Sequence, residues 1–368
     1  MSRHSCLAVC APGLEDLLRA EMDALGLRPG TPLTGGVPFS GGDRDLYRAN
    51  VHLSIASRIL VRIARFPARE FWELEKHART VPWETWVPPG GEAAFRVTSR
   101  TSRLFHADAV AERLAAAVAH RVPVQEAAAA PAIPFVVRLV HDRMTISADS
   151  SGEHLHRRGY RLATAKAPLR ETLAAAMLAA SGWPGDAPLL DPFGGAGTIV
   201  LEAARRALGI PPGLQRTFAF QSWPGYRPGT WASVVGAAKQ GRSPATVAPI
   251  LGSDRDAGAV ARSRENADRA GVAEHVRFER HPFERLQPPA AEGWVVTNPP
   301  FGRRIAIERG AAGLHGVLAS VFSGPFAGWD VTLLSADPAL DAALGERFVE
   351  VFRTRTGGVP VRCLRRAT

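Results

Sequence analysis

The chain has 368 residues, of which 46% are hydrophobic, and this length suits a globular protein of two or three domains. No apolar run approaches the length of a membrane span, and acidic residues soon follow the short apolar patch at the start, which argues against a secretory signal. Cys6, Cys10 and Cys363 offer neither a disulfide framework nor a zinc spacing, so we expect no metal site and a location in the reducing cytoplasm.

The net charge of +10 favours a polyanionic partner, and nucleic acid is the first candidate. The basic residues are almost all arginine, however, and alanine is abundant. A compositionally biased genome would produce the same excess of positive charge. Charge therefore favours a nucleic-acid partner without establishing one.

The first 150 residues mix short strands and helices. The predicted elements are a strand at 7–9, a helix at 13–26, a strand at 35–39, a helix running into a strand over 51–66, a helix over 71–83, a strand at 94–97, a helix over 107–120 and a hairpin of strands 135–140 and 144–147. This mixture indicates a compact α+β module.

A basic run with an aromatic residue inside it follows at residues 156–161, with the sequence HRRGYR. Such a run can contact phosphates while its aromatic ring stacks on a base. It is equally typical of a solvated linker between two domains. The sequence leaves both interpretations open.

From about residue 168 the pattern becomes a regular alternation of strands and helices, which predicts a doubly wound, mostly parallel sheet. Residues 209–249 interrupt this alternation and are interpreted as an insertion. The expected helices lie at 169–180, 198–207, 257–270 and around 313–321, and the expected strands at 188–191, 250–254, 276–278, 294–297 and 329–335.

The strongest local signal is the sequence DPFGGAGT, residues 191–198, between a strand and a helix. Glycines there let a ligand approach the backbone and the helix N-terminus closely. A carboxylate before the loop suits a ligand that carries an ammonium group, such as the methionine end of S-adenosylmethionine, better than it suits a phosphate. The alternative is an ordinary glycine turn beside a structural aspartate.

A second acidic residue, Asp254, ends the next predicted strand. A carboxylate at this position can accept hydrogen bonds from both ribose hydroxyls of a nucleoside. It follows Asp191 by 63 residues, a distance that the inserted segment must explain. Alternatively, Asp254 or Asp256 is simply the N-cap of the next helix.

The third signal is Asn298-Pro299-Pro300-Phe301, directly after a hydrophobic strand. The Asn298 side chain can accept a hydrogen bond from an exocyclic amino group, and a rigid Pro-Pro can present a backbone carbonyl to its second N–H. The nitrogen lone pair then points at a methyl sulfonium without a strong base, while Phe301 stacks on the base. This string predicts methylation of an amino group, and an accidental turn is the alternative.

With these residues in hand, the chain resembles the THUMP-domain RNA methyltransferases, and within them the bacterial 23S rRNA guanine-N2 methyltransferases in a form with one methyltransferase domain. The similar segments are residues 13–15, 44–155, 156–161, 167–176, 189–204, 212–223, 252–256 and 298–303. The resemblance implies a ferredoxin-like segment at 1–43, a THUMP RNA-binding domain at 44–155 and a Rossmann-like class I methyltransferase domain at 156–368 with an insertion at about 209–249.

The resemblance also implies S-adenosylmethionine as the methyl donor, and the N2 amino group of a guanine in RNA, rRNA first, as the acceptor. The implied residues at the target base are Asn298, Pro299, Pro300 and Phe301. The implied cofactor-binding residues are Asp191, Phe193, Gly195, Gly197, Thr198, Asp254, Phe283 and Asn298.

Three departures from the family pattern matter. The glycine loop has Gly-Gly-Ala-Gly at 194–197 where the family usually has Cys-Gly-Ser-Gly, which keeps the backbone contacts. Pro282 stands at the usual acidic position beside the adenine, so adenine recognition would pass to the backbone and Phe283. Phe301 replaces the more common tyrosine. Longer members of the family carry a second methyltransferase domain.

Two alternatives stay open. The Asn-Pro-Pro-Phe string serves adenine N6 as well as guanine N2, and the RNA could be tRNA; the THUMP-like half argues for RNA over DNA. The second alternative is a non-catalytic RNA-binding assembly factor with a degenerate cofactor site, which Pro282 keeps open. The sequence does not indicate the oligomeric state.

Overall fold

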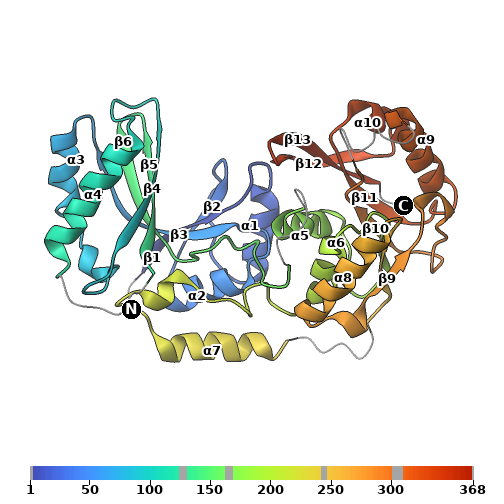
Figure 1. Cartoon of the computed structure of the whole chain (residues 1–368), viewed down its shortest axis with the longest axis horizontal. Helices are drawn as coiled ribbons and strands as arrows, with labels where there is room; N and C mark the ends of the chain where they lie inside the picture. Colours follow the sequence, from blue (N-terminus) through green and yellow to red (C-terminus); the bar gives the residue numbers. More distant parts are fainter. Residues whose placement is uncertain (1–2, 124–130, 162–168, 242–246, 301–309, 367–368) are drawn as a thin grey trace.

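The computed structural model describes residues 3–123, 131–161, 169–241, 247–300 and 310–366, and it contains two lobes, each built on one β-sheet (Figure 1). An α+β lobe precedes a doubly wound, mostly parallel α/β lobe, which confirms the predicted fold class. Within the described ranges, no helix has the length and apolar character needed to cross a membrane.

The N-terminal lobe has a six-stranded sheet in the order β2-β1-β3-β6-β5-β4. Along β5, Phe135, Val137 and Leu139 are buried beneath helices, whereas Val136 and Arg138 lie on the other face. At β5, one face of the sheet is therefore covered by helices and the other is open. The elements are β1 (His4–Val9), α1 (Glu15–Ala24), β2 (Gly36–Gly41), α2 (Asp43–His52), β3 (Arg58–Pro67), α3 (Phe71–Ala78), η1 (Trp83–Thr85), β4 (Ala93–Arg100), α4 (Ala107–Arg121), β5 (Ile133–Val140) and β6 (Arg143–Asp149).

The C-terminal lobe has a seven-stranded sheet in the order β12-β13-β11-β10-β7-β8-β9. Strands β7 to β11 are parallel, and β13 and β12 extend the sheet in an antiparallel manner. The elements are α5 (Glu171–Ala180), β7 (Leu189–Asp191), α6 (Thr198–Ala207), η2 (Ala219–Ser222), α7 (Pro228–Lys239), β8 (Ile250–Asp254), α8 (Ala257–Ala270), η3 (Ala273–His275), β9 (Arg277–Arg280), η4 (Phe283–Arg285), β10 (Trp294–Thr297), α9 (Gly310–Ser323), β11 (Asp330–Ser335), α10 (Pro338–Leu344), β12 (Val349–Thr356) and β13 (Val359–Arg366).

The chain reverses its direction of travel across this sheet between β7 and β10. From β7 it proceeds through β8 to β9, and it then returns to the other side of β7 for β10 and β11. In open parallel sheets, ligands bind outside the carboxyl ends of the strands at such a switch point. The carboxyl ends of β7, β8 and β10 are therefore the expected position of the site.

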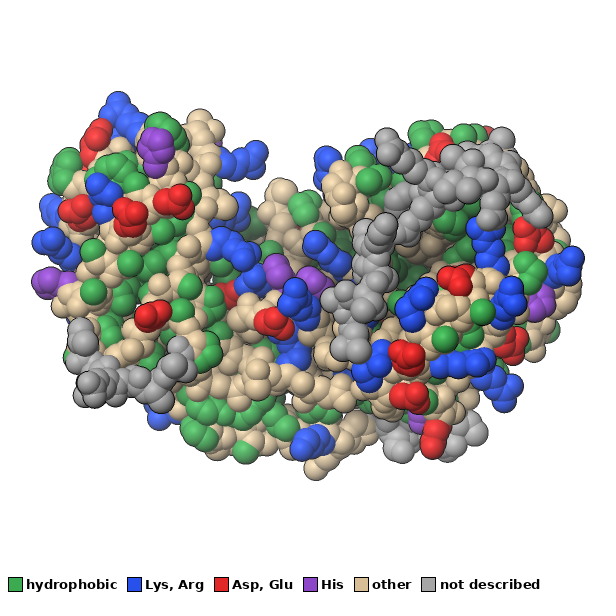
Figure 2. Space-filling model, in the orientation of Figure 1, with side chains coloured by type: hydrophobic (Ala, Val, Ile, Leu, Met, Phe, Trp, Pro, Cys, Tyr) green, Lys and Arg blue, Asp and Glu red, His purple; other side chains and the backbone are tan. Residues whose placement is uncertain are grey.

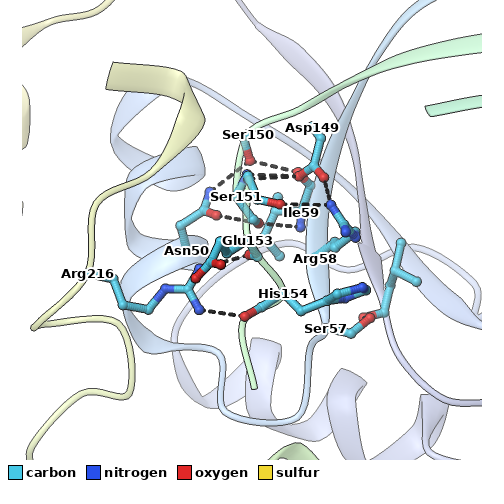
Figure 3. A network of polar contacts seen from close by, with 12 residues as sticks. Asn50, Ser57, Arg58, Ile59, Asp149, Ser150, Ser151, Glu153, His154 and Arg216 are labelled. Atoms are coloured by element: carbon cyan, nitrogen blue, oxygen red, sulfur yellow. Dashed lines mark hydrogen bonds and ion pairs between the residues drawn. The ribbon is translucent and has the colours of Figure 1, made fainter. Parts of the chain in front are cut away.

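The inserted segment folds back onto the N-terminal lobe. It contains η2 and α7, and α7 lies below the other helices in Figure 1. The ring of Phe220 stacks on Tyr47 of α2 with a centroid distance of 4.4 Å. The guanidinium of Arg216 donates hydrogen bonds to the backbone carbonyls of Glu153 and His154 at 2.8 and 2.6 Å (Figure 3). The two lobes are thus joined at more places than the single chain crossing.

Within the basic run at 156–161 the structure corrects both interpretations for Arg158 and Tyr160, whereas Arg157 is exposed. Arg158 and Tyr160 are each only 1% exposed, so neither lies in a solvated linker and neither can stack on a base or contact a phosphate. The Tyr160 hydroxyl donates a hydrogen bond to Glu202 Oε1 at 2.9 Å, and Arg158 lies 3.4 Å from the same carboxylate. Arg158 also donates to the carbonyl of Ser54 in the other lobe at 2.5 Å.

Two predicted helices have wrong boundaries. The helix expected at the start of 51–66 is already ending there, because α2 stops at His52 and β3 begins at Arg58. The helix expected over 71–83 ends five residues early, because Pro82 cannot continue it. Helices α7 and α10 and the hairpin of β12 and β13 were not predicted.

Candidate functional site

Three of the residues singled out in the sequence meet at one edge of the C-terminal sheet. Asp191 is the last residue of β7 and Asp254 the last residue of β8, while Asn298 directly follows Thr297 at the end of β10. The strand β7 pairs in parallel with both β8 and β10, so these three strand ends are neighbours. The sheet therefore assembles one site at its switch point from residues more than 100 positions apart.

Asp191 is a buried carboxyl group with two hydrogen-bond donors. It is 2% exposed, and it accepts hydrogen bonds from the Thr297 hydroxyl at 2.7 Å and from the Phe193 N–H at 3.1 Å. Burial, with a smaller contribution from the charge of Asp254, raises the pKa of Asp191 to about 7 against the opposing effect of the two hydrogen bonds. Thr297, which sequence reasoning gave no role, is therefore part of the site; its only signal was its place beside Asn298.

The glycine loop lies across the end of β8. Gly195 and Gly197 have φ values of +56° and +81°, a conformation that favours glycine, and Gly197 is the N-cap of α6. The Gly195 N–H donates to Asp254 Oδ2 at 3.0 Å. From α8, the side chains of Ser263 and Asn266 each donate to a backbone carbonyl of the loop at 3.0 Å. These two residues were not predicted, and only their spacing on one face of α8 could have indicated them.

The structure separates the two acidic residues near the end of β8. The side chain of Asp256 accepts the N–H of Gly258 at 2.8 Å and caps α8. Asp254 instead bonds to the glycine loop, so the interpretation as a helix N-cap applies to Asp256 and not to Asp254.

Asn298 presents an unsatisfied acceptor. Its Oδ1 is buried and has no hydrogen-bond partner among the described residues. Pro299 is buried and Pro300 is half-buried, which holds the strand end in place. Phe301 lies outside the described residues, so its predicted contact with a base stays a prediction.

The remaining predicted residues line or support the same edge. The half-buried ring of Phe193 faces the ring of Phe283 at a centroid distance of 5.0 Å. Phe283 is 6% exposed and also packs against Phe322, so its predicted contact with adenine stays untested. Thr198 begins α6 and is 5% exposed, and its hydroxyl lies 3.5 Å from the guanidinium of Arg161.

The donors and acceptors fit a ligand rich in N–H groups. Asp191 has no cationic partner among the described residues, and Asn298 Oδ1 is a buried acceptor with nothing to accept. A buried acceptor without a donor is costly, so both groups suit a ligand that supplies an ammonium or amino group. In the part of the chain that the structure describes, no cluster of three or more His, Cys, Asp or Glu residues could hold a metal ion.

Protein-family models match three consecutive segments of the chain. Residues 5–60 match the RlmL ferredoxin-like domain and residues 68–149 match the THUMP domain. Residues 158–366, more than half of the chain, match the RMKL-like methyltransferase domain.

Two named relatives cover almost the whole chain. The RNA methyltransferase candidate slr0064 of Synechocystis sp. is 32% identical over 97% of this chain and 95% of its own length. The ribosomal RNA large subunit methyltransferase K/L of Syntrophotalea carbinolica is 34% identical over 97% of this chain, which spans 52% of that longer protein.

Solved structures show the same arrangement of both lobes. A methylase candidate from Clostridium difficile 630 matches with a TM-score of 0.91 and 26% identity, covering 99% of this chain and 98% of its own. The methyltransferase candidate SMU.472, solved in complex with SAH, matches with a TM-score of 0.90 and 27% identity over 100% of this chain and 98% of its own. A protein described as an N6-adenine-specific DNA methylase from Listeria monocytogenes matches with a TM-score of 0.89 and 28% identity over 99% and 96%. The chain therefore belongs to the THUMP-domain RNA methyltransferase family, with an RMKL-like methyltransferase domain behind RlmL ferredoxin-like and THUMP domains.

Proposed function

We propose that this protein transfers a methyl group from S-adenosylmethionine to the exocyclic N2 amino group of a guanosine in structured RNA, with 23S rRNA as the first candidate. The observation that carries the proposal is the buried Asn298 Oδ1, which has no partner among the described residues and follows a strand that neighbours the one ending at Asp191. Support comes from the SAH complex of SMU.472 and from the rRNA methyltransferase K/L among the relatives.

Asp191, Asp254 and the glycine loop would hold the cofactor, which supplies an activated methyl group when it is bound. Asp191 suits the ammonium group, since no described residue offers the buried carboxyl a cation. Asp254 would accept hydrogen bonds from the ribose hydroxyls. It also accepts the Gly195 N–H and so holds the glycine loop in place. Phe193, Gly197 and Thr198 line the same edge, and Phe283 would contact the adenine.

Asn298 would position the acceptor amine. Its Oδ1 would accept one N–H of the amino group, and the carbonyl of Pro299 would accept the second. Both bonds hold the nitrogen lone pair in line with the methyl carbon and draw electron density toward nitrogen. The donor would supply the methyl group for the new N–C bond, with its sulfur as the leaving group, and the surplus amine proton would pass to solvent. Pro300 would stiffen the turn and Phe301 would stack on the base.

The change of Asn298 to Ala tests this proposal. We expect the transfer rate to RNA to fall by about two to three orders of magnitude, as for other pre-organised donors and acceptors at reacting atoms. The rise in melting temperature on adding S-adenosylmethionine should persist, because Asp191 and the glycine loop are unchanged. Transfer is measured with tritiated donor and total RNA that lacks the modification.

The exposed amide of Gln240, at the end of α7, provides the matched control. Gln240→Ala should leave both the transfer rate and the cofactor-dependent melting shift unchanged. Transfer by Asn298→Ala at the wild-type rate would refute the assigned role.

A second candidate keeps the donor and changes the acceptor to adenine N6 or to a tRNA guanine. Adenine N6 appears in the name of the similar Listeria protein, and Asn-Pro-Pro-Phe fits either amino group. A non-catalytic assembly factor is the third candidate, because Pro282 replaces the usual acidic residue. Nucleoside mass spectrometry on rRNA, tRNA and DNA from a deletion strain distinguishes them, since each predicts a different missing base or none.

A further inference from the structure

The open face of the N-terminal sheet carries arginines from four adjacent strands. The strand registers place them on one face, since Arg96 pairs with Val136, Arg138 with Thr145, and Arg62 with Ser147. Figure 1 places α3 and α4 on the outer side of this sheet, and Figure 2 shows basic side chains along the wall that faces the C-terminal lobe. The arginines of this face are Arg62, Arg65, Arg96, Arg100, Arg138 and Arg143.

These arginines lack partners in the part of the chain that the structure describes, unlike three on the helical side of the same lobe. Among the described residues, none of the six makes an ion pair or a side-chain hydrogen bond. On the helical side, Arg103, Arg113 and Arg121 each pair with a glutamate at 2.7 to 3.2 Å. Asp149, at the end of the open face, is already paired with Arg58. The open face therefore gathers six arginines from adjacent strands that no carboxylate among the described residues neutralises.

A hollow of about 400 Å³ lies within this face. Its floor is apolar, and two of its residues, Leu33 and Val140, are large hydrophobic side chains that are 52% and 36% exposed. Its remaining lining consists of Cys6, Leu7, Leu60, Val136, His141, Thr145, Ser147 and the arginines Arg62, Arg65, Arg138 and Arg143. This volume is in the range of small-molecule and cofactor sites.

An apolar floor lined also by four arginines matches the two halves of a nucleotide. Phosphate contacts need the guanidinium groups but gain nothing from exposed Leu33 and Val140. A base gains from the apolar floor and from the planes of His141 and the arginines, on which bases stack. In a duplex the base faces are stacked on one another, so only an unpaired nucleotide can use both features.

We propose that this face binds an unpaired segment of the substrate RNA, with one base in the hollow and the flanking phosphates on the arginines. The proposal rests on the proposed function for the identity of the polyanion, and it adds the face, the pocket and the unpaired state of the RNA. It also assigns the sheet, and not α3 and α4, as the RNA-contacting side of the lobe.

The first test measures binding of a fluorescein-labelled unpaired RNA of about 12 nucleotides, within the size range of single-strand sites. Arg62→Gln/Arg138→Gln should weaken binding by tenfold or more at moderate salt. For this variant the slope of log affinity against log salt concentration should be shallower by about 1 to 1.5, because each lost phosphate contact reduces the slope by about 0.7. The matched control, Arg103→Gln/Arg121→Gln, removes the same charge from the helical side and should change affinity less than twofold.

The second test separates the hollow from general electrostatic attraction. Val140→Gln keeps the charge and removes apolar surface from the hollow, and it should weaken binding of the unpaired RNA three- to tenfold. Val351→Gln is the control, because Val351 lies on β12 and is exposed to a similar extent, 39%. The same RNA annealed to its complement should bind Val140→Gln and wild type equally.

Equal losses in the two arginine pairs, no effect of Val140→Gln, or equal affinity for the duplex and the unpaired RNA would each overturn the proposal. The melting shift with S-adenosylmethionine is recorded for every variant and should not change. Loss of RNA binding with an intact shift supports the proposed face, whereas a wild-type protein that binds RNA but not the donor counts against the methyltransferase function alone.

Discussion

Asp191 is where the chemistry of the site depends most on a single residue. A carboxyl group that is 2% exposed and has no cation among the described residues is an unfavourable place for a negative charge, which is why its pKa rises to about 7. A ligand ammonium would reverse this effect by pairing with the ionised form. Binding of the donor should therefore release a proton from Asp191.

The affinity for S-adenosylmethionine should accordingly depend on pH. Only the ionised carboxyl pairs with the ammonium, so affinity should fall about tenfold for each pH unit below 7 and level off above about 8. Isothermal titration from pH 6 to 9, in buffers with different heats of ionisation, measures both the affinity and the proton released.

Asp191→Asn should bind the donor weakly and without this pH dependence. Asp186→Asn, which changes an exposed carboxyl near the same strand, should behave as wild type. A wild-type affinity that is constant from pH 6 to 8 would show that the ammonium does not pair with Asp191.

At the residue scale, the sequence indicates the groups that act directly but not those that hold them. Asp191, Asp254 and Asn298 stand at strand ends in recognisable strings, and the structure brings them to one edge. Thr297, Ser263 and Asn266 act through single hydrogen bonds that form only in the folded chain. Their roles follow from three-dimensional proximity, which no local pattern encodes.

At the scale of elements, the segment between the two lobes forms a polar cluster with α5 and α6, and most of this cluster is buried. Arg158 and Tyr160 both contact Glu202 of α6, which is 6% exposed, and Arg161 lies 3.0 Å from Glu171 of α5. A buried cluster of this kind is costly to break, because removing one charge leaves its partner uncompensated in the core.

Glu202→Ala should lower the free energy of unfolding by about 3 kcal/mol, because it leaves Arg158 buried without its carboxylate. Glu202→Gln, which keeps an acceptor for the Tyr160 hydroxyl, should cost less, about 1 to 2 kcal/mol. Urea unfolding followed by tryptophan fluorescence measures both values.

Glu153→Ala is the control for this comparison. Glu153 pairs with Arg157, and the two side chains are 67% and 66% exposed, so their loss should cost less than about 1 kcal/mol. If Glu202→Ala costs no more than this control, the cluster does not stabilise the junction.

The helices and strands also divide into those that a local sequence pattern predicts and those that depend on contacts in the folded chain. Periodic segments such as α4, α8 and β5 appear where the sequence predicts them. For Arg158 in the basic run at 156–161 the interpretation is wrong, because its polarity indicates solvent or phosphate whereas Glu202 makes its burial possible. Helix α7 has small residues and glycine that give no clear pattern, and it forms against α2 of the other lobe.

At the scale of the whole molecule, the insertion contributes an aromatic cluster that joins the lobes. Tyr47 is 2% exposed, with Phe220 stacked on it and the ring of Trp231 at its edge at 6.0 Å. The six-stranded sheet contains strands from both sides of residue 43, because β1 pairs with β2 and also with β3. The division of the chain at residues 43 and 155 stays a prediction.

Tyr47→Ala should lower the free energy of unfolding by about 3 to 5 kcal/mol, because it opens a cavity at this junction. Amide hydrogen exchange in residues 213–239 should accelerate, while the melting shift with S-adenosylmethionine persists. Trp72→Ala removes an aromatic ring that is 63% exposed, and it should cost less than about 0.5 kcal/mol. Unchanged exchange in α7 after Tyr47→Ala would contradict this account of the junction.

The double attachment of the insertion has a consequence for how a substrate would be chosen. Arg216 and Phe220 hold the insertion to one lobe while the chain on both sides of it belongs to the other. This attachment would then set the distance between the open sheet face and Asn298. An RNA would be modified when its fold presents an unpaired nucleotide and the target base at this one separation. Such an enzyme would recognise its target by the shape of the RNA. It would need few contacts with the bases between the unpaired nucleotide and the target base.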